Sequence, residues 1–313
     1  MSQAKIVVLD GEYANPGDLS WDGLNEFGEV EVYQKTPQKS LIKRAKDASI
    51  IITNKVEIRE KDFDQLPNLK LIIISATGMN NVDLGIAKSR GIPVKNVSSY
   101  STNSVAQHTW ALILELTNRV AMHDMDVKKG NWNKDKGFSY MLTSIPELSG
   151  RKLGIYGLGE IGRKVADIGT SFGMNILVCS NHARQEDYPD FQLVNLDELF
   201  LQSDIISLHA PLRDDNYHVV DKNLLHKMKH SAMLINTARG PLVDENDLFD
   251  VLNNQKIRGA ALDVLNTEPA GENHRLFDLD NCIITPHMAW MTKVSRSTLI
   301  QGVVRHIADY VNL

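Results

Sequence analysis

Short apolar runs recur along most of the chain, separated by polar or helix-like segments. Four lie in the first hundred residues, at Ile6–Leu9, Ile50–Thr53, Leu71–Ser75 and Ile92–Val97. Six more follow residue 150, at Leu153–Tyr156, Ile176–Cys179, Asp204–Leu208, Met233–Asn236, Gly259–Asp263 and Cys282–Ile284. The runs lack a regular polar alternation, which is typical of parallel strands covered by helices on both faces. The pattern therefore predicts an α/β protein with two doubly wound parallel sheets.

The segment between the two sets of strands has a different pattern. Candidate caps near residue 98 precede a long helix with four apolar positions on one face, Val105, Leu112, Leu116 and Val120. Residues 128–150 are polar with little periodicity, so we expect them to run over the surface. Three aromatic residues are expected to anchor this excursion, namely Trp132, Phe138 and Tyr140.

The length of 313 residues favours two domains, because one hydrophobic core rarely organises so long a chain. We assign residues 1–99 to a smaller, flavodoxin-like domain that binds the substrate. Residues 100–288 are assigned to a Rossmann dinucleotide-binding domain. The helix-like residues 289–313 are expected to return to the first domain and complete it.

Composition and charge exclude several classes of function. The net charge is −5 and the basic residues are scattered, so no nucleic-acid partner is expected. The aliphatic runs are too short to cross a bilayer, and the first residues do not resemble a signal peptide, which predicts a cytoplasmic protein without a membrane partner. Cys179 and Cys282 lie in strand-like runs without CxxC spacing, so we expect two small apolar residues and no metal site.

Three glycines, Gly157, Gly159 and Gly162, lie between a predicted strand and a predicted helix. In a dinucleotide-binding fold the first permits a tight turn, the second lets the backbone approach a pyrophosphate, and the third lets helix and strand pack closely. Glu160 and Ile161 lie in the same turn, where a helix N-terminus offers N–H groups to phosphates. We interpret these five residues as part of a site for NAD or NADP. A tight turn without a ligand is the alternative.

The residue after the second strand of this domain bears on the choice of cofactor. NAD-selective folds usually have an acidic residue there, which accepts hydrogen bonds from the ribose hydroxyls. This chain has Ser180 instead, followed by Asn181, His182 and Arg184, which could donate hydrogen bonds to a 2′-phosphate. NADP is therefore a candidate beside NAD, although Arg184 could equally be a solvated loop residue.

Arg239, Glu268 and His287 follow the fourth, fifth and sixth predicted strands of the second domain. Ligand sites in doubly wound sheets lie beyond the carboxyl ends of the strands. Separately, each residue could be structural, so their shared position is the evidence for a site. Asp263, at the end of the fifth strand, is assigned to the nicotinamide carboxamide, with an ordinary strand-end role as the alternative.

Arg239, Glu268 and His287 together meet the requirements of 2-keto acid reduction. The reaction needs a hydride from the cofactor, a proton on the carbonyl oxygen and a cation that holds the carboxylate. We assign the proton to His287 and the cation to Arg239. Glu268 is the natural partner of His287, because an adjacent carboxylate favours the protonated imidazolium. Trp290 is expected either to shape the substrate pocket or to pack at a domain junction.

Five motifs resemble those of the NAD(P)-dependent D-2-hydroxyacid dehydrogenases, in the same order along the chain: GLGEIGRKVA, LHAPL, INTARGPLVDE, ALDVLNTEP and TPHMAW. The resemblance implies that Arg239, Glu268 and His287 are the catalytic trio. It also implies cofactor contacts at His209, Pro211, Thr237 and Ala238, and a carboxylate-binding loop at Thr77, Gly78 and Met79. Members of this family are commonly dimers, so the resemblance implies a homodimer.

Within the family, the segments SATGMNNVD, YSTNSVAQHTWALILEL and HMAW are most similar to the glycerate dehydrogenase and hydroxypyruvate reductase branch. We therefore expect reversible hydride transfer between the nicotinamide and a small 2-keto acid, with hydroxypyruvate or glyoxylate reduced to D-glycerate or glycolate. Two alternatives stay open. One is a corepressor-like protein that senses NAD(H) without turnover, and the other is a family member that acts on another acid, such as D-lactate or formate.

Overall fold

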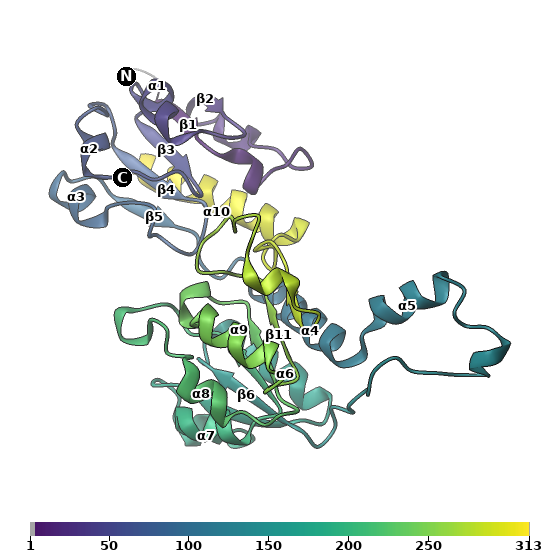
Figure 1. The fold of residues 1–313 in the computed structure, drawn as a ribbon. Coiled ribbons are helices and arrows are strands. Elements are labelled where there is room, and N and C mark those ends of the chain that lie inside the picture. Colours follow the sequence, from purple (N-terminus) through teal and green to yellow (C-terminus); the bar gives the residue numbers. More distant parts are fainter. Residues whose placement is uncertain (1–3, 313) are drawn as a thin grey trace. The chain divides into compact units, whose positions relative to one another are not determined.

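The computed structural model describes residues 4–312, which divide into two compact units (Figure 1). Unit 1 takes in the chain up to Ser101 and resumes at Trp290, and unit 2 comprises Thr102–Ala289. Each unit is built on its own parallel sheet. The predicted α/β fold class, with two parallel sheets, is confirmed.

Unit 1 contains a five-stranded parallel sheet in the order β2-β1-β3-β4-β5. The strands are β1 (Ala4–Val8), β2 (Gly28–Val32), β3 (Ile50–Thr53), β4 (Leu71–Ile74) and β5 (Val94–Asn96). The α-helices are α1 (Leu41–Ala45), α2 (Glu60–Phe63), α3 (Leu84–Ser89) and α10 (Lys293–Val311). The strand order 2-1-3-4-5 is that of flavodoxin-like sheets.

Neighbouring residues of the unit 1 strands pack on opposite faces of the sheet. Val7 and Ile51 belong to a buried cluster with residues of α1, α2 and α3. Ile6 and Ile50 belong to a second buried cluster that includes residues of α10. Because both faces are covered, β3 and β4 are buried at every position and are mostly apolar, which explains the hydrophobic runs in the sequence.

Unit 2 contains a seven-stranded parallel sheet in the order β12-β11-β10-β9-β6-β7-β8. The strands are β6 (Lys152–Tyr156), β7 (Asn175–Cys179), β8 (Gln192–Leu193), β9 (Ile205–Leu208), β10 (Met233–Asn236), β11 (Gly259–Leu262) and β12 (Cys282–Ile284). The α-helices are α4 (Thr102–Asn118), α5 (Val120–Lys128), α6 (Glu160–Ser171), α7 (Leu196–Gln202), α8 (Lys222–Lys227) and α9 (Glu245–Asn253). The order reverses between β6 and β9, which is the Rossmann arrangement and marks where such sheets bind ligands.

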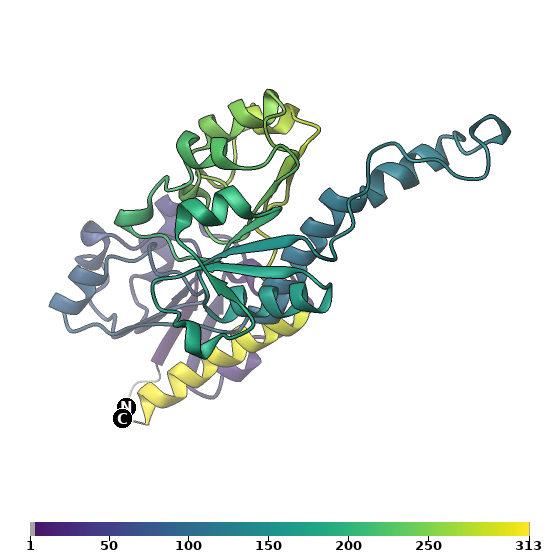
Figure 2. The ribbon, with the colours of Figure 1, turned by 90° about the horizontal axis from the view of Figure 1, so that it is seen from below.

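One face of the unit 2 sheet is covered by α7, α8 and α9, and the other by α4 and α6 (Figure 2). Leu234 of β10 lies in the first of these buried clusters, and its neighbours Met233 and Ile235 lie in the second. The indole N–H of Trp110 in α4 donates to the carbonyl of Val165 in α6 at 3.1 Å. This bond joins the two helices that cover the second face.

Two edge strands, β2 and β8, are absent from the sequence prediction. The sequence of β2 is GEVEV, in which charged residues alternate with valine, and β8 contains two residues. An edge strand pairs on one side only and tolerates short, charged sequences, so an apolar run does not mark it. The first sheet therefore has five strands where four are predicted, and the second has seven where six are predicted.

The predicted long helix is two helices. α4 ends at Asn118, Arg119 has a left-handed φ of +50°, and α5 begins at Val120. The other three apolar positions on the predicted face are buried, but the assignment of Val120 to that face is wrong. The left-handed residue changes the direction of the chain, and Val120 is 62% exposed.

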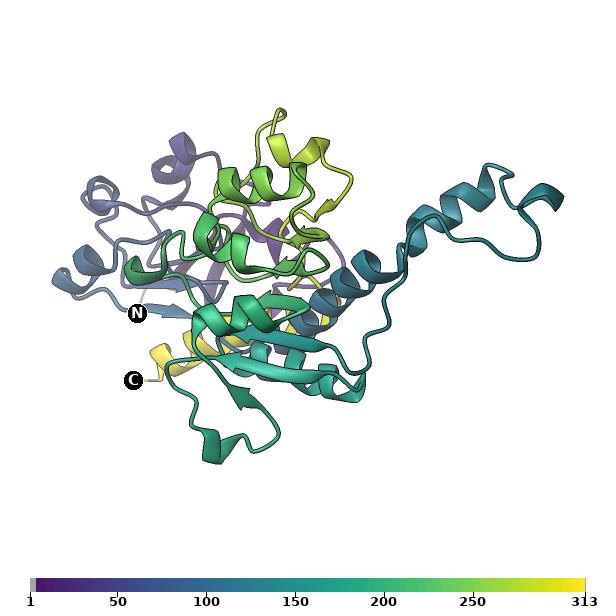
Figure 3. The ribbon, with the colours of Figure 1, turned by 60° about the horizontal axis from the view of Figure 1, so that its bottom comes forward.

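α5 and the residues that follow it project from the rest of unit 2 as an arm, residues 120–147 (Figure 3). The expectation that Trp132 and Phe138 anchor this segment is wrong, because they are 57% and 93% exposed. Tyr140 does hold the arm together, since its hydroxyl donates to Asp126 of α5 at 2.8 Å. The aromatic residues of the arm therefore do not bury themselves in the core of their own chain.

Both cysteines are free and partly buried, Cys179 in β7 and Cys282 in β12. Burial raises the pKa of the Cys282 thiol to about 12, so the reactive thiolate is scarce near neutral pH. Within residues 4–312 no group of three or more His, Cys, Asp or Glu side chains could hold a metal ion. No helix in that range has the length and apolar character needed to span a membrane.

Candidate active site

The turn from Gly157 to Gly162 leaves β6 at the point where the strand order reverses. Gly157 has a φ of +94°, and a β-carbon there would lie 2.5 Å from the backbone nitrogen of Ala210. A β-carbon on Gly162 would lie 2.2 Å from the carbonyl oxygen of Gly157. Both positions therefore require glycine, the first for the turn against the loop after β9 and the second for the packing of α6.

Gly159 differs from these two glycines, because among residues 4–312, apart from Gly159 and its two chain neighbours, no atom lies within 4 Å of the position that its β-carbon would take. It is the N-cap of α6, and Glu160 and Ile161 are the first residues of that helix. A helix N-terminus has unpaired N–H groups and a positive partial charge. The open space at Gly159 therefore fits the pyrophosphate of a dinucleotide.

The loop after β9 contributes His209 and Pro211 beside the glycine turn. Nε2 of His209 lies 2.8 Å from Oγ of Ser207, and its buried Nδ1 has no hydrogen-bond partner within residues 4–312. Burial lowers the pKa of His209 to about 3, so the imidazole is neutral at physiological pH. His209 would therefore offer a cofactor a neutral ring. The carbonyl of Pro211 accepts a hydrogen bond from the Asn216 side chain at 2.8 Å.

The residues assigned to the adenosine ribose follow β7 directly. Ser180 is partly buried, and Asn181 and Arg184 are exposed. The backbone N–H of His182 lies 3.5 Å from Oγ of Ser180, which is a weak hydrogen bond. No carboxylate stands at position 180, so a 2′-phosphate would meet no negative charge from this residue.

Arg239, Glu268 and His287 follow β10, β11 and β12, which are consecutive neighbours in the sheet. The three strands are parallel, so their carboxyl ends lie along one edge of unit 2. The sheet order therefore brings the three side chains, predicted from separate motifs, to one edge.

Asn236, the last residue of β10, shapes the turn that carries Arg239. Its side-chain amide donates to the carbonyl of Arg239 at 2.9 Å, and its Oδ1 accepts from the N–H of Ala238 at 3.0 Å. In the same turn, the hydroxyl of Thr237 lies 2.9 Å from that of Thr109 in α4. The guanidinium of Arg239 donates through Nη1 to the carbonyl of Ala238 at 2.6 Å. Its remaining donors suit a bidentate grip on a carboxylate.

Nδ1 of His287 lies 2.6 Å from Oε2 of Glu268. The other carboxylate oxygen, Oε1, accepts from the N–H of Leu265 at 3.0 Å. The His287 and Glu268 side chains are 28% and 33% exposed, so this contact is only partly open to solvent. Because Nδ1 faces Glu268, Nε2 is the ring nitrogen that can exchange a proton with a substrate.

The backbone at His287 is left-handed, with a φ of +52°, a conformation that costs free energy in any residue except glycine. Asp263 holds this strained segment in place. Its Oδ1 accepts from the Thr285 hydroxyl at 2.6 Å and from the N–H of Met288 at 2.9 Å, and its Oδ2 accepts from the N–H of Ala289 at 2.8 Å. Both oxygens of Asp263 therefore contact the loop that presents His287.

Asp263 is ionised although it is only 1% exposed. Burial by itself raises the pKa of this carboxyl, but hydrogen bonds from His108, Thr285 and two backbone N–H groups outweigh that effect and lower the pKa. His108 of α4 places Nε2 3.0 Å from the Thr285 hydroxyl and 3.4 Å from Oδ1 of Asp263. The carboxylate of Asp263 is thus satisfied inside unit 2 by donors from two separate segments, α4 and the loop after β12.

The predicted substrate loop, Thr77, Gly78 and Met79, follows β4 in unit 1. Within the described part of the chain, none of its three backbone N–H groups donates to another backbone group. Such donors are what a carboxylate-binding turn provides. The side chain of Asn96 donates to the carbonyl of Thr77 at 2.7 Å and holds the start of the loop.

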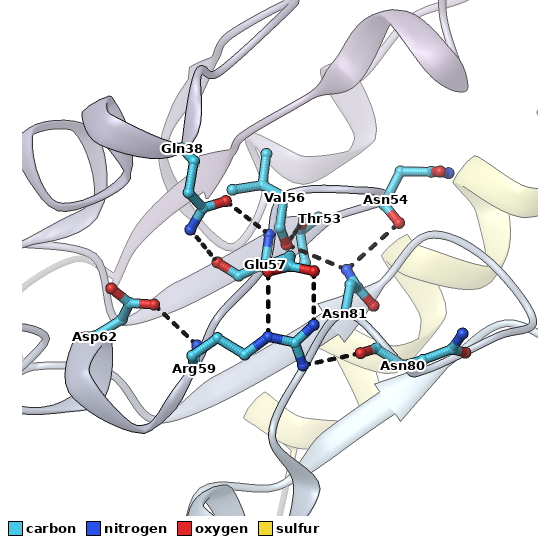
Figure 4. Close-up of polar contacts among 9 residues, drawn as sticks. All are labelled: Gln38, Thr53, Asn54, Val56, Glu57, Arg59, Asp62, Asn80 and Asn81. Carbon is cyan, nitrogen blue, oxygen red and sulfur yellow. Dashed lines mark hydrogen bonds and ion pairs between the residues drawn. The ribbon is translucent and has the colours of Figure 1, made fainter. Parts of the chain in front are cut away.

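A polar network joins this loop to the one that follows β3 (Figure 4). The side-chain amide of Asn81 donates to the carbonyls of Asn54 and Val56 at 3.4 and 3.3 Å. Nη1 of Arg59 donates to the carbonyl of Asn80 at 3.0 Å. The accepting groups are main-chain carbonyls of both loops, so these bonds set the backbone course after Met79.

Trp290 lies in unit 1, where its ring packs edge-on against Tyr100 with a centroid separation of 6.0 Å. The ring is also packed against the buried cluster that contains residues of α10.

The sequence prediction missed the residues that position the site, including His108, Asn236 and Thr285. His108 and Thr285 are 177 residues apart in the chain, so no local pattern marks their contact. Asn236 did carry a signal, because it is a polar residue that ends an otherwise apolar strand.

A Rossmann sheet with a glycine turn at its switch point, and with an arginine and a carboxylate–imidazole pair at the same sheet edge, is the arrangement of a dinucleotide-dependent oxidoreductase. Comparison with known proteins agrees. Residues 110–289 match the family model described as D-isomer specific 2-hydroxyacid dehydrogenase, NAD binding domain. The chain belongs to this family, as its motifs predict.

Full-length relatives narrow the assignment. The hydroxypyruvate reductase of Blautia hydrogenotrophica is 39% identical over 311 residues, which are 98% of this chain and 97% of that protein. The glycerate dehydrogenase of Methylorubrum extorquens is 37% identical over 309 residues, covering 98% and 96% of the two chains. A solved structure of an acyclic imino acid reductase in complex with NADPH and D-Arg superposes with a TM-score of 0.86 at 30% identity, covering 98% of this chain and 97% of that one.

These findings confirm the predicted family and its glycerate dehydrogenase and hydroxypyruvate reductase branch. The chain is an oxidoreductase, and its cofactor is NAD or NADP.

Proposed function

We propose that this enzyme reduces hydroxypyruvate or glyoxylate, giving D-glycerate or glycolate, and catalyses the reverse oxidation. The observation that carries this proposal is the 2.6 Å contact between His287 and Glu268, at the sheet edge that also holds Arg239. The hydroxypyruvate reductase and glycerate dehydrogenase relatives support the choice of small 2-keto acids.

In the proposed reaction, Arg239 binds the substrate carboxylate and orients the neighbouring carbonyl. When bound, the nicotinamide supplies the hydride that reduces the carbonyl carbon. Nε2 of His287 gives its proton to the carbonyl oxygen, and the imidazole stays bonded through Nδ1 to Glu268. The carboxylate of Glu268 stabilises the imidazolium before transfer and fixes the ring orientation afterwards.

We assign the second contact with the substrate carboxylate to Thr77, Gly78 and Met79. Their backbone N–H groups donate to no other backbone group within the described chain, and the Arg59 and Asn81 bonds hold the loop that contains them. The cofactor is assigned to the glycine turn with Glu160 and Ile161, to His209 and Pro211, and to Thr237 and Ala238.

A steady-state assay with a panel of 2-keto acids tests the proposal. The panel contains hydroxypyruvate, glyoxylate, pyruvate and phosphohydroxypyruvate, each with NADH and NADPH, and formate is tested with both oxidised cofactors. We expect the highest kcat/KM with hydroxypyruvate or glyoxylate. A higher value with pyruvate or formate would contradict the substrate assignment. Cofactor binding without turnover of any acid would favour a sensor of NAD(H).

The residue at position 180 is proposed to permit NADPH. We expect Ser180→Asp to lower the ratio of kcat/KM for NADPH to that for NADH by at least about tenfold, because a carboxylate would repel the 2′-phosphate and bind the ribose hydroxyls. Ser231→Asp adds the same charge at an exposed position after α8 and is the control. An unchanged ratio in Ser180→Asp would show that this residue does not contact the adenosine ribose.

We propose that two copies of the chain form a homodimer through the arm, residues 120–147. The arm exposes a set of large apolar side chains, Val120, Met122, Met125, Val127, Trp132, Phe138, Met141, Leu142 and Ile145. Apolar surface on this scale is costly to leave in water, and a second copy placed by a two-fold axis would cover it with the same surface.

Light scattering after size-exclusion chromatography tests the dimer. We expect a particle of twice the chain mass of 35.0 kDa, and dissociation of Phe138→Asp/Met141→Asp into monomers at low micromolar concentration. Leu201→Asp changes an apolar residue of α7 that is 58% exposed, and this variant is expected to leave the dimer intact. A monomeric wild-type protein would contradict the proposal.

A further inference from the structure

Unit 2 contains a second carboxylate–imidazole pair, formed by Glu245 and His274. Glu245 is the first residue of α9, and His274 precedes the short helical turn Arg275–Asp278. Oε2 of Glu245 lies 3.2 Å from Nε2 of His274. Oε1 of the same carboxylate accepts a hydrogen bond from the backbone N–H of Asn266 at 2.7 Å. Asn266 lies in the loop that carries Glu268, so this pair touches the backbone of the active site.

The two ring nitrogens of His274 differ in their surroundings. Its Nδ1 is buried and has no hydrogen-bond partner in the part of the chain that the structure describes. A proton on Nδ1 would therefore be a buried, unsatisfied donor, which is costly. A proton on Nε2, donated to Glu245, avoids that cost. The other oxygen of the same carboxylate accepts the hydrogen bond from the N–H of Asn266.

Gly240 packs against another side of the loop that contains Asn266. A β-carbon on Gly240 would lie 2.0 Å from the carbonyl carbon of Leu265 and 2.5 Å from the nitrogen of Asn266. The backbone next to Arg239 thus lies directly against the backbone of residues 265–266. The N–H of Leu265 in turn donates to Oε1 of Glu268 at 3.0 Å. A shift of residues 265–266 would therefore move the carboxylate that faces His287.

We propose that Glu245 is a positioning residue for the Glu268–His287 pair. It acts through the N–H of Asn266, and His274 holds the Glu245 carboxylate in the orientation that this bond requires. The inference rests on the proposed function, because it assigns Glu245 a part in the same proton transfer. It does not require any particular 2-keto acid.

Three substitutions at position 245 separate positioning from other roles. Glu245→Ala removes the bond to Asn266. Glu245→Asp keeps the negative charge at the N-terminus of α9 but shortens the side chain, so it loses the reach to Asn266. Glu245→Gln removes the charge but keeps an oxygen that can accept from the N–H. Asp250→Ala, an exposed carboxylate of the same helix, is the matched control.

We expect Glu245→Ala and Glu245→Asp to lower kcat by about 10- to 100-fold while KM changes less than about threefold, since small displacements of catalytic groups reduce the chemical step most. Glu245→Gln should retain at least half of the wild-type kcat, and Asp250→Ala should match the wild type. Activity of Glu245→Asp equal to that of the wild type would overturn the proposal, as would a Gln variant no better than the Ala variant.

A double-mutant cycle with Glu268→Gln tests whether Glu245 acts through Glu268. We expect Glu245→Ala to reduce kcat much less in the Glu268→Gln background than in the wild type, because the group that it positions is already disabled. Additive losses would overturn the proposal and assign Glu245 an independent structural role.

A readout without substrate keeps this test separate from the proposed function. The short His287–Glu268 bond is expected to give a downfield imidazole N–H resonance in proton NMR, identified by its absence in His287→Ala. We expect this resonance to persist in Asp250→Ala and Glu245→Gln, and to move upfield or broaden in Glu245→Ala and Glu245→Asp. An unchanged resonance in Glu245→Ala would refute the positioning role, whereas absence of turnover with every acid would refute only the proposed function.

Discussion

His287→Ala is expected to lower kcat for 2-keto acid reduction by about 10²- to 10⁴-fold, which is the usual contribution of a general acid. The variant lacks the imidazole that lies 2.6 Å from Glu268, and with it the group assigned to protonate the carbonyl oxygen. Binding of NADH or NADPH, followed by quenching of protein fluorescence, should stay within about threefold of the wild type. This combination separates loss of proton transfer from loss of the fold.

His226→Ala is the control for this experiment, because His226 is exposed on α8 and its Nδ1 contacts only the carbonyl of Lys222 in its own helix among the described residues. Its kcat should equal that of the wild type. If His287→Ala oxidised the reduced cofactor at the wild-type rate, the assignment of the acid to His287 would be wrong. Glu268→Gln should give a smaller loss than His287→Ala, because the ring remains but loses the carboxylate that stabilises its protonated form.

Gly157→Ala is expected to destabilise unit 2 by about 2–5 kcal/mol. A left-handed backbone costs a residue with a β-carbon about 1–2 kcal/mol, and forcing that carbon to within 2.5 Å of Ala210 adds a steric cost of about 1–3 kcal/mol. For a unit of this size the loss corresponds to a decrease in Tm of about 5–15 °C. Differential scanning calorimetry without cofactor measures it, and an unchanged Tm would contradict the left-handed turn at Gly157 and its close approach to Ala210.

Gly159→Ala in the same turn should behave differently. Within the described chain, the added methyl group would meet no atom within 4 Å outside residues 158–160, so Tm without cofactor should stay within about 2 °C of the wild type. The methyl group would occupy the space assigned to the pyrophosphate, so we expect Kd for NADH and NADPH to rise by at least about tenfold. A normal cofactor affinity in this variant would show that the pyrophosphate lies elsewhere.

How well the sequence predicts each helix or strand depends on how completely that element is buried. The central strands β3, β4, β6, β9 and β10 are covered on both faces, so their sequences are mostly apolar and predict them without structural information. The edge strand β2 alternates charge with valine, and β8 is too short to show a pattern. The sequence also does not predict the boundary between α4 and α5 at Arg119. Val120 continues the helical spacing of apolar residues, although the backbone at Arg119 is left-handed.

The arm, residues 120–147, is a second part of the chain whose packing the sequence does not predict. Aromatic residues in a polar segment usually indicate contacts with the core, and on that basis Trp132 and Phe138 were expected to be anchors. Their exposure shows that these two apolar side chains do not pack into the core of their own chain. A sequence shows that a side chain is apolar. It does not show whether the residues that cover this side chain belong to the same chain or to a second copy of it.

The amino-acid sequence alone determined the class of fold, and it predicted the glycine turn and the candidate residues Arg239, Glu268 and His287, because each lies in a local motif next to a strand. Only the tertiary structure decided which groups hold that chemistry in place. His108 and Thr285 are 177 residues apart in the chain, and Glu245 and Asn266 are 21 residues apart. The residues of each pair meet only because the sheet order brings their segments together. Hydrogen bonds between distant segments depend on angstrom-scale positions, and spacing along the chain does not encode those positions.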